Sequence, residues 1–478
     1  MTVKCDNRVN LLFPQDRGAA LIAAINRATV GVRTFAVVWF GQVISFIGSG
    51  MTSFALGVWI YQKTGSVTQF ALTSLFIVLP RVVLGPLAGA LVDRWDRRHV
   101  MILSDAGGGL SILALGLLSL AGRLEIWHIY LAIFASGIFD TLRWPAMTAA
   151  TTQLVPKEHF GRASGMLQIV SAGTMLVSPL LAGPLMGSLG LKGVLLSDFG
   201  TFLFSILTLV LIRIPRPETT AEGQAGRGSL LHEAVYGWKY ITARSGLLAL
   251  LVFLALANFL MEMSVVLFTP MLLSFASAAA LGLVMSLAGV GYLIGSVGIS
   301  IWGCPKRRIP TMMMALLLMG VFMMLIGLRA SLPLVAVSAC LCMVFLPITV
   351  SANQAIWQSR VAPDVQGRVF AIRQAFIQAT PLLAYLITGP LTDGIFEPLL
   401  QAGGPLAGSV GQIIGVGSGR GAGLLFVSAG LFLVLVAVIG YLYPPMRRME
   451  AELPKAPAAQ PIAVASGSQS LAPLPAMD

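Results

Sequence analysis

Apolar residues gather along this chain in long runs that short polar stretches separate. A helix that crosses about 30 Å of hydrocarbon needs about 20 predominantly apolar residues. Twelve runs of that length can be counted, at residues 34–60, 66–92, 99–121, 125–152, 160–189, 191–213, 245–273, 277–302, 309–328, 331–357, 366–392 and 422–443. The pattern predicts an all-α membrane protein with twelve transmembrane helices.

Composition agrees with a chain surrounded by lipid and excludes several other functions. Hydrophobic residue types make up 56% of the chain and charged types only 10%, whereas a soluble domain is about one quarter charged. The net charge of +12 comes from basic residues in short loops, which argues against a nucleic-acid partner. Scattered histidines, no P-loop and no nucleophile–base pair predict that the chain is not an enzyme and binds no metal or cofactor.

The polar breaks between the runs predict five segments. These are a cytoplasmic N-terminal segment at 1–33, a six-helix bundle at 34–213, a cytoplasmic linker at 214–244, a second six-helix bundle at 245–444 and a disordered cytoplasmic tail at 445–478. A Gly-rich loop is expected at 393–421, and its last part, Gly415 to Gly421, is expected to be a flexible loop on the outer side.

Basic residues predict how the chain sits in the membrane. With both termini in the cytoplasm, the inner segments hold 24 of the 31 Lys and Arg residues and the outer loops hold five. Cytoplasmic loops are enriched in Lys and Arg. We therefore expect a multi-pass protein of the cell (inner) membrane, of bacterial origin, with both termini inside.

Three short matches between the two halves recur at one spacing of 206 residues. The pair Gly85 and Gly89 recurs as Gly291 and Gly295, Gly161-Arg162 recurs as Gly367-Arg368, and Gly183-Pro184-Leu185 recurs as Gly389-Pro390-Leu391. One shared offset indicates two parallel copies of a six-helix unit. Parallel repeats are typical of transporters whose site lies between the halves near the bilayer midplane.

The segment after the second run carries the most specific motif. Gly85 and Gly89 share a helix face that is expected to let another helix approach closely, and the run ends in Asp93-Arg94-Trp95-Asp96-Arg97-Arg98. This segment resembles the signature loop between spans 2 and 3 of the major facilitator superfamily, with Asp96 in place of the usual glycine.

A second segment resembles one branch of that superfamily, the macrolide-efflux-like exporters. It reads Ile356-Trp357-Gln358-Ser359-Arg360-Val361-Ala362-Pro363-Asp364-Val365-Gln366-Gly367-Arg368-Val369-Phe370, and Gly389-Pro390-Leu391-Thr392-Asp393 follows. The resemblance implies the major facilitator fold and a cytoplasmic gate that closes and opens as the halves rock. The gate residues it implies are Gly89, Asp93, Arg94, Arg97 and Arg98. The alternative is that these arginines only fix the topology.

Six ionisable residues lie at membrane depth: Arg81, Asp105, Asp140, Arg143, Asp198 and Glu262. Such residues are costly in lipid and usually face a cavity or a partner. Glu262 has no basic neighbour in sequence and is a candidate for proton coupling.

Partners for the other membrane-depth charges are predicted from spacing. Asp140 and Arg143 are three residues apart in span 4, which makes them candidates to pair and to take part in proton translocation. For Asp105 a structural contact to Arg81 is expected, and Asp198 is expected to be hydrated near the outer end of span 6.

Uncharged polar residues indicate where a solute cavity lies. Span 1 lacks a carboxylate but offers Gln42 and Ser45, and span 11 offers Gln374 and Gln378. Methionines in several spans, Met175 among them, are either adaptable cavity lining or lipid-facing residues.

These features together predict a monomeric, proton-coupled exporter of a small hydrophobic solute, drug-like or a natural product. The alternatives are a metabolite or siderophore transporter, and a membrane sensor or lipid-handling protein without transport.

Overall fold

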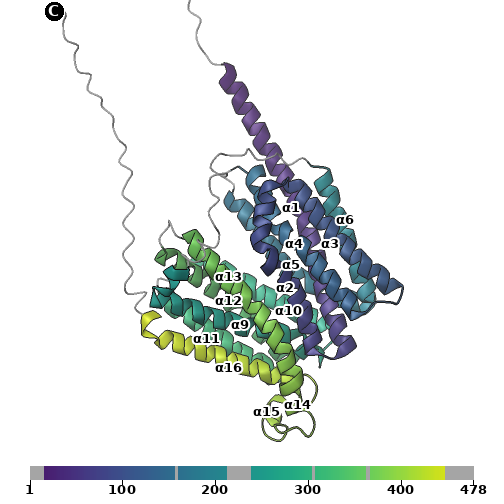
Figure 1. Cartoon of the computed structure of the whole chain (residues 1–478), viewed down its shortest axis with the longest axis vertical. Helices are drawn as coiled ribbons and strands as arrows, with labels where there is room; N and C mark the ends of the chain where they lie inside the picture. The colour runs from purple at the N-terminus through teal and green to yellow at the C-terminus, as the bar shows by residue number, and fades with distance from the viewer. Residues whose placement is uncertain (1–14, 157–159, 213–237, 304–306, 362–365, 447–478) are drawn as a thin grey trace, which may run out of the picture.

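The computed structural model describes residues 15–156, 160–212, 238–303, 307–361 and 366–446. The described chain is helical, with twelve long helices in two bundles (Figure 1). Eleven of these helices are long and apolar enough to cross a membrane by length and composition. The twelfth, α4 (Ile126–Leu154), carries Asp140 and Arg143. Most of the linker at 214–244, the tail from 447 and residues 1–14 lie outside the described residues.

The first bundle contains six long helices. They are α1 (Gln15–Thr64), α2 (Val67–Arg94), α3 (Arg97–Leu120), α4 (Ile126–Leu154), α5 (Phe160–Ser188) and α6 (Gly190–Val210). We call the side of the molecule where α1 ends and α2 begins the far side. The opposite side, where α2 ends and α3 begins, is called the termini side, because the last long helix, α16, also ends there (Figure 1).

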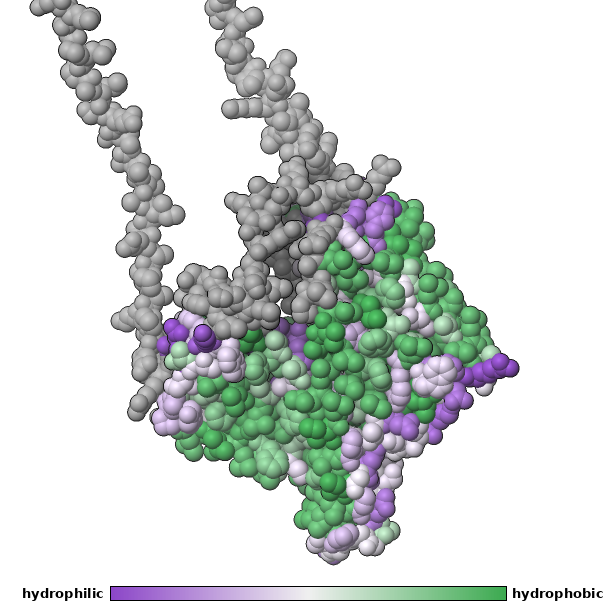
Figure 2. All heavy atoms as spheres, viewed as in Figure 1, coloured by the Kyte–Doolittle hydropathy of each residue, from purple (hydrophilic) through white to green (hydrophobic). Residues whose placement is uncertain are grey.

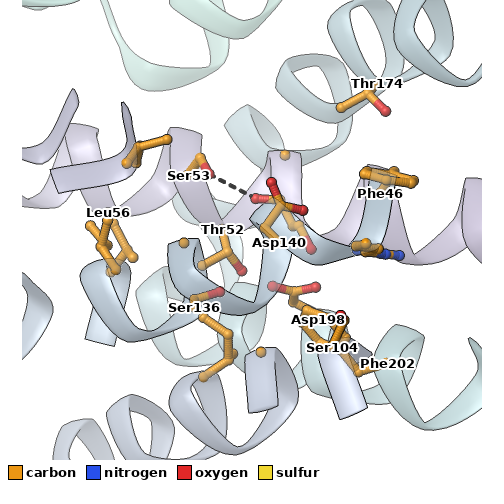
Figure 3. Close-up of a pocket in the computed structure, with 18 of the residues that line it drawn as sticks. Phe46, Thr52, Ser53, Leu56, Ser104, Ser136, Asp140, Thr174, Asp198 and Phe202 are labelled. Atoms are coloured by element: carbon orange, nitrogen blue, oxygen red, sulfur yellow. Dashed lines mark hydrogen bonds between the residues drawn. The ribbon is translucent and has the colours of Figure 1, made fainter. Parts of the chain in front are cut away.

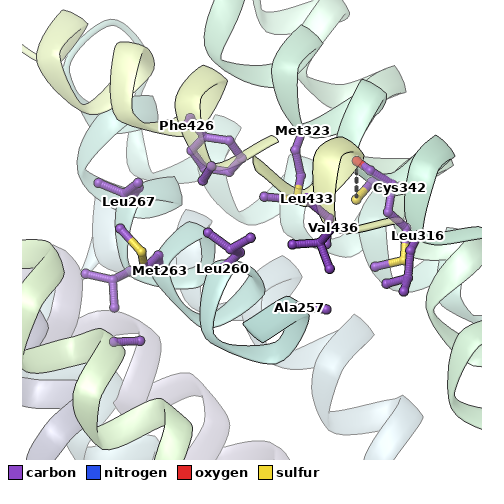
Figure 4. Close-up of a cluster of buried hydrophobic side chains, with 14 of the residues drawn as sticks. Ala257, Leu260, Met263, Leu267, Leu316, Met323, Cys342, Phe426, Leu433 and Val436 are labelled. Atoms are coloured by element: carbon purple, nitrogen blue, oxygen red, sulfur yellow. Dashed lines mark hydrogen bonds between the residues drawn. The ribbon is translucent and has the colours of Figure 1, made fainter. Parts of the chain in front are cut away.

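The second bundle also contains six long helices. They are α9 (Ser245–Leu273), α10 (Ala278–Trp302), α11 (Arg308–Leu328), α12 (Leu332–Arg360), α13 (Gln366–Leu391) and α16 (Arg420–Leu442). Between the last two lie the π-helical turn η3 (Thr392–Phe396), α14 (Glu397–Leu400) and α15 (Gly411–Ile414). Leu267, Met323, Phe426 and Leu433 from three of the long helices point toward one another in its apolar core (Figure 4).

Each long helix presents one face to its neighbours and another outward, as α3 illustrates. Leu103, Leu110 and Leu117 recur every seven residues on α3 and are exposed. On the opposite face the α3 helix has a glycine, and a Cβ at Gly108 would lie 3.0 Å from the Phe202 ring of α6. Apolar residues cover most of the face seen in Figure 2. Such a surface is suited to lipid rather than to water.

The bundles meet through equivalent contacts on both sides of the boundary. A Cβ at Gly183 of α5 would meet the backbone of Ala278, at the start of α10, and a Cβ at Gly389 of α13 would meet Thr68, at the start of α2. Gly183 and Gly389 are the glycines that the sequence places 206 residues apart. The repeat therefore extends to how each half packs on the other.

One carboxylate also joins the bundles at the far side. Asp393 of η3 accepts hydrogen bonds from the Ser66 hydroxyl at 2.7 Å, the Val67 amide at 3.0 Å and the Thr68 amide at 2.9 Å. These donors form the first turn of α2, so Asp393 caps a helix of the opposite bundle. We call this contact the Asp393 cap.

At the termini side, two sets of contacts each join residues of the same bundle. Arg98 donates to the carbonyls of Leu209 and Val210 at 2.8 and 2.7 Å, all in the first bundle. In the second bundle, Trp238 stacks on Phe376 with ring centroids 5.3 Å apart. The described contacts between the bundles, at Asp393, Gly389, Gly183 and Ser286, lie between the far side and the middle of the helices.

The expected close packing at Gly85 is not found. No described atom lies within 4 Å of a Cβ placed at Gly85, whereas Gly291 and Gly295 of the second copy pack directly on the Cys340 and Val344 carbonyls of α12. Gly85 lies about 25 Å along α2 from the Thr68 contact. The side chain environment of Gly89 lies outside the described residues.

Two segments contain helices for which the sequence made no prediction. Helix α1 begins at Gln15, inside the predicted N-terminal segment, where alanines favour helix. The stretch at 393–421, expected to be a Gly-rich loop, is folded: the Glu397 carboxylate accepts hydrogen bonds from the Gly419 and Ala422 amides and caps α16. Leu400 and Ile414 of this stretch are buried.

Candidate functional site

A polar cavity of about 260 Å³ lies inside the first bundle. Its walls combine hydroxyl groups and charges with apolar side chains such as Phe46 and Leu56 (Figure 3). The polar lining residues are Ser49, Thr52, Ser53, Arg81, Ser104, Ser136, Asp140, Arg143, Thr174 and Asp198. Four of the six predicted membrane-depth charges therefore converge on one cavity.

Asp140 pairs with Arg81 of α2, not with Arg143 as its spacing predicted. Arg81 Nη2 lies 3.2 Å from Asp140 Oδ2, and the two side chains are 52% and 37% exposed. Helix α4 packs against both α2 and α3, so residues three apart on it face different neighbours. The half-exposed pair is accessible to a solute or to water.

Arg143 instead pairs with Asp105 of α3, which corrects the expected contact between Asp105 and Arg81. Arg143 Nε lies 3.1 Å from Asp105 Oδ1 and donates to Gln42 Oε1 at 2.8 Å. Gln42 Nε2 and the Ser205 hydroxyl donate to Asp105 Oδ2 at 2.9 and 2.7 Å. Both charges are almost fully buried. The residues of this network come from α1, α3, α4 and α6, so the network joins these four helices.

Two residues predicted to line a solute cavity belong to this packed region. Gln42 is fully buried within the Arg143 network, and Ser45 is fully buried as well. Neither lines the polar cavity. The same helix face presents Ser49 and Thr52 to the cavity one and two turns further on, so α1 contributes hydroxyl groups from other positions.

Glu262 pairs with a residue that the sequence did not single out. The Tyr385 hydroxyl of α13 donates to Glu262 Oε2 at 2.7 Å. The Arg81 charge of the first bundle acts electrostatically on the same tyrosine. Arg81 and Glu262 lie near the middle of α2 and α9, and Tyr385 lies six residues before the end of α13. Arg81 and the Glu262–Tyr385 pair thus belong to opposite bundles.

The polar residues of span 11 lie on α13, outside the two cavities described. Gln374 is exposed and Gln378 is half-buried on α13, and neither lines a described cavity. Arg373 donates to Gln354 Oε1 at 2.8 Å and lies over the Trp357 ring. Whether the two glutamines contact a solute stays a prediction.

The predicted gate is described in part. Asp96 Oδ1 accepts from the Arg98 amide at 2.9 Å and caps α3, which explains an acidic residue where the motif usually has glycine. Arg98 binds the last carbonyls of α6, a favourable place for a cation at a helix C-terminus. The side chains of Asp93 and Arg94 lie outside the described residues.

A second cavity, of about 200 Å³, is apolar and lies mostly within the second bundle. It is lined by Met175 of α5 together with methionines and aromatic residues of the second bundle, namely Met261, Phe268, Met285, Met323, Met343 and Phe426. For Met175, Met261 and Met285, the sequence allowed either cavity lining or contact with lipid. In the structure these three methionines line a cavity. Flexible thioethers can repack around different apolar ligands.

Twelve long helices in two bundles, with charges held near mid-membrane, define a polytopic membrane transporter. The sequence profile of the Major Facilitator Superfamily matches residues 38–384. The chain belongs to this superfamily, and it is a transporter of small solutes rather than an enzyme.

Known relatives carry names from drug efflux. The chain is 25% identical to macrolide efflux protein A of Streptococcus pyogenes over 370 residues, covering 76% of this chain and 90% of the relative. It is 26% identical to multidrug efflux pump Tap of Mycolicibacterium fortuitum over 369 residues, covering 75% and 88%.

Solved structures share the fold. A bacterial homolog of the human lysosomal transporter Spinster, in an inward-facing and unoccupied conformation, superposes with a TM-score of 0.68 at 15% identity. The alignment covers 90% of this chain and 99% of that one. At this identity the likeness extends to the fold alone.

Proposed function

We propose that the chain is a secondary-active exporter of hydrophobic drug-like or natural-product molecules, driven by protons that return as the solute leaves. In this proposal residues 34–213 and 245–444 rock against each other as two rigid bundles of a monomer. The termini side faces the cytoplasm of a bacterial inner membrane, as the basic loops predict. The described conformation, joined at the far side, is then the one open to the cytoplasm.

The observation that carries the proposal is the meeting of charged groups at the boundary between bundles. Arg81 with Asp140 on one side, and Glu262 with Tyr385 on the other, are held near mid-membrane beside an apolar methionine-lined cavity. A hydrophobic solute fits the apolar cavity, while a carboxylate can bind and release a proton. The names of the relatives support export of drug-like molecules.

The gate residues have a role in the same cycle. Gly85 is unpacked here, and Gly89, Asp93, Arg94, Arg97 and Arg98 follow it at the cytoplasmic end of α2. When the cytoplasmic side closes, the α2 face that carries these glycines packs on the opposite bundle and the acidic end of α2 locks the closed state. Arg98 also holds α6, so its substitution affects stability as well as gating.

Efflux assays in a pump-deficient bacterial host test the proposal. Cells that express the chain should accumulate less of a labelled macrolide and less ethidium, and a protonophore should reverse the difference. Glu262→Gln should abolish gradient-driven export with normal membrane insertion. Tyr385→Phe keeps the ring but removes the hydrogen bond, so it should weaken coupling less than Glu262→Gln. Unchanged accumulation of a broad compound panel would reject the export function in favour of a sensor or lipid-handling protein.

A further inference from the structure

Three buried oxygen atoms that line the polar cavity have no hydrogen bond within 3.5 Å among the described residues. They are Asp198 Oδ2 of α6, Thr52 Oγ1 of α1 and Ser104 Oγ of α3. Their residues are 1%, 3% and 2% exposed, and Figure 3 shows the three side chains around one space. Buried polar atoms are almost always paired, so three in one cavity indicate a missing ligand.

The charges around the cavity define the sign of that ligand. Arg81 pairs with Asp140, and Arg143 pairs with Asp105. Asp198 remains as a buried carboxylate outside these ion pairs. The Thr201 hydroxyl donates to its Oδ1 at 3.2 Å, and the Thr52 hydroxyl lies near enough to interact with the same carboxylate. With both ion pairs neutral, Asp198 leaves this group of five ionisable residues with one net negative charge. An unpaired buried charge is costly, and one bound positive charge removes that cost.

Among the described residues that line the cavity, Arg81 and Arg143 are the cations, and each already faces another carboxylate. Helix α6 contacts α1, α3 and α5. Toward the cavity α1 contributes hydroxyls such as Thr52, α5 contributes Thr174, and α3 contributes Ser104. Arg143 of α4 lines the same cavity and acts on Asp198 electrostatically. Its Nε faces Asp105 and Gln42, and its Nη2 has no hydrogen-bond partner among the described residues.

We propose that Asp198, with the Thr52 and Ser104 hydroxyls, forms an intramembrane site for one monovalent cation, and that binding at this site is required for coupling in addition to Glu262. The inference rests on the proposed export function and names the ion site within it. The ligand set consists of hard oxygen atoms. It accepts either a proton, which bonds to Asp198 Oδ2 and later leaves to the opposite solution, or a sodium ion held by all three oxygens.

Ion binding can be measured on the purified full-length chain without any solute. For a proton, infrared difference spectra between acidic and alkaline buffer should show a carboxyl band in the wild type that Asp198→Asn removes. For sodium, sodium chloride should raise the melting temperature relative to an equal concentration of choline chloride. Asp198→Asn should abolish that rise, and Thr52→Ala or Ser104→Ala should reduce it.

Several outcomes overturn the ion site. They are a carboxyl band lost in Glu262→Gln but retained in Asp198→Asn, a sodium effect equal in wild type and Asp198→Asn, and no cation effect in the wild type. Ser136→Ala is the matched control, because it removes another hydroxyl from the same cavity. If Asp198→Asn folds poorly, Thr52→Ala and Ser104→Ala test the site at normal charge.

Transport in proteoliposomes separates this inference from the proposed function. One returning cation sustains a solute gradient on the order of fiftyfold per 100 mV. Asp198→Asn should lose that gradient but still exchange labelled for unlabelled macrolide. Full gradient-driven export in Asp198→Asn overturns the ion site and leaves the exporter intact. A cation signal on Asp198 without transport of any compound leaves the ion site intact and overturns the exporter.

Discussion

Removing the Asp393 cap should release the bundles at the far side. Asp393→Ala deletes the acceptor of three hydrogen bonds that join η3 to the first turn of α2. Hydrogen bonds to a charged group contribute about 1.5–3 kcal/mol each. The carboxylate is half-buried and water replaces part of these bonds on opening, so we take about 3 kcal/mol for all three. The ratio of far-side-closed to far-side-open molecules should therefore fall about 150-fold.

The shift can be read as a distance between spin labels. Arg123 lies in the α3–α4 turn of one bundle and Arg329 in the α11–α12 turn of the other, both exposed at the far side. Cysteines introduced there, with the four native cysteines replaced, report opening by pulsed electron paramagnetic resonance. Asp393→Ala should move most of the distance distribution to longer values.

A pair of serine variants separates the inter-bundle bond from simple helix capping. Ser66 caps α2 and also donates to Asp393, whereas Ser277 caps α10 by accepting from the Ala280 amide at 3.2 Å. Ser66→Ala should favour opening about fivefold, for one lost bond of about 1 kcal/mol, and Ser277→Ala should not. Wild-type distances in Asp393→Ala would refute the reasoning.

Two further predictions concern stability. Arg143→Met leaves Asp105 as a buried charge without its cation, so we expect a loss of about 3–5 kcal/mol, measured as a lower melting temperature in detergent. Gly295→Leu should push α10 from α12 at a cost of at least about 1–3 kcal/mol, whereas Gly85→Leu meets no described neighbour and should melt like wild type. Equal losses for both leucine variants, or a wild-type melting temperature for Arg143→Met, would contradict the described packing.

The helices were predictable from sequence because lipid imposes a length and an apolar composition on each span. The ends of α9, predicted at 245–273, agree with the structure. Outside the apolar runs, the sequence did not predict how the chain folds. The loop at 393–421 folds through Glu397, a contact across more than 20 residues that no local pattern reveals.

Partners of the buried charges were less predictable than their positions. Spacing along α4 predicted that Asp140 and Arg143 pair, but neighbouring helices lie on either side of α4 and each residue binds a different one. Tyr385 carried no signal, since an aromatic residue in an apolar run is ordinary. Asp198 was expected to be hydrated, because the sequence shows its depth along span 6. The sequence does not show that α1, α3 and α6 enclose its side chain.

The two halves share a fold but differ in the chemistry of their cavities. The first bundle holds Asp198 in a polar cavity, whereas the second holds the apolar cavity with Met261 and Phe426. If ion and solute occupy these separate cavities, they influence each other only through the conformations of the protein, and their coupling is reciprocal and finite.

Increasing concentrations of macrolide should therefore weaken cation binding by a factor that reaches a plateau. Direct competition for one site would weaken it in proportion to solute concentration without limit. Titrating the cation effect on wild-type protein at rising solute concentration distinguishes the two. A plateau that persists in Ser136→Ala but changes in Asp393→Ala would place the coupling in the equilibrium between far-side-closed and far-side-open states. Unlimited competition would refute separate sites.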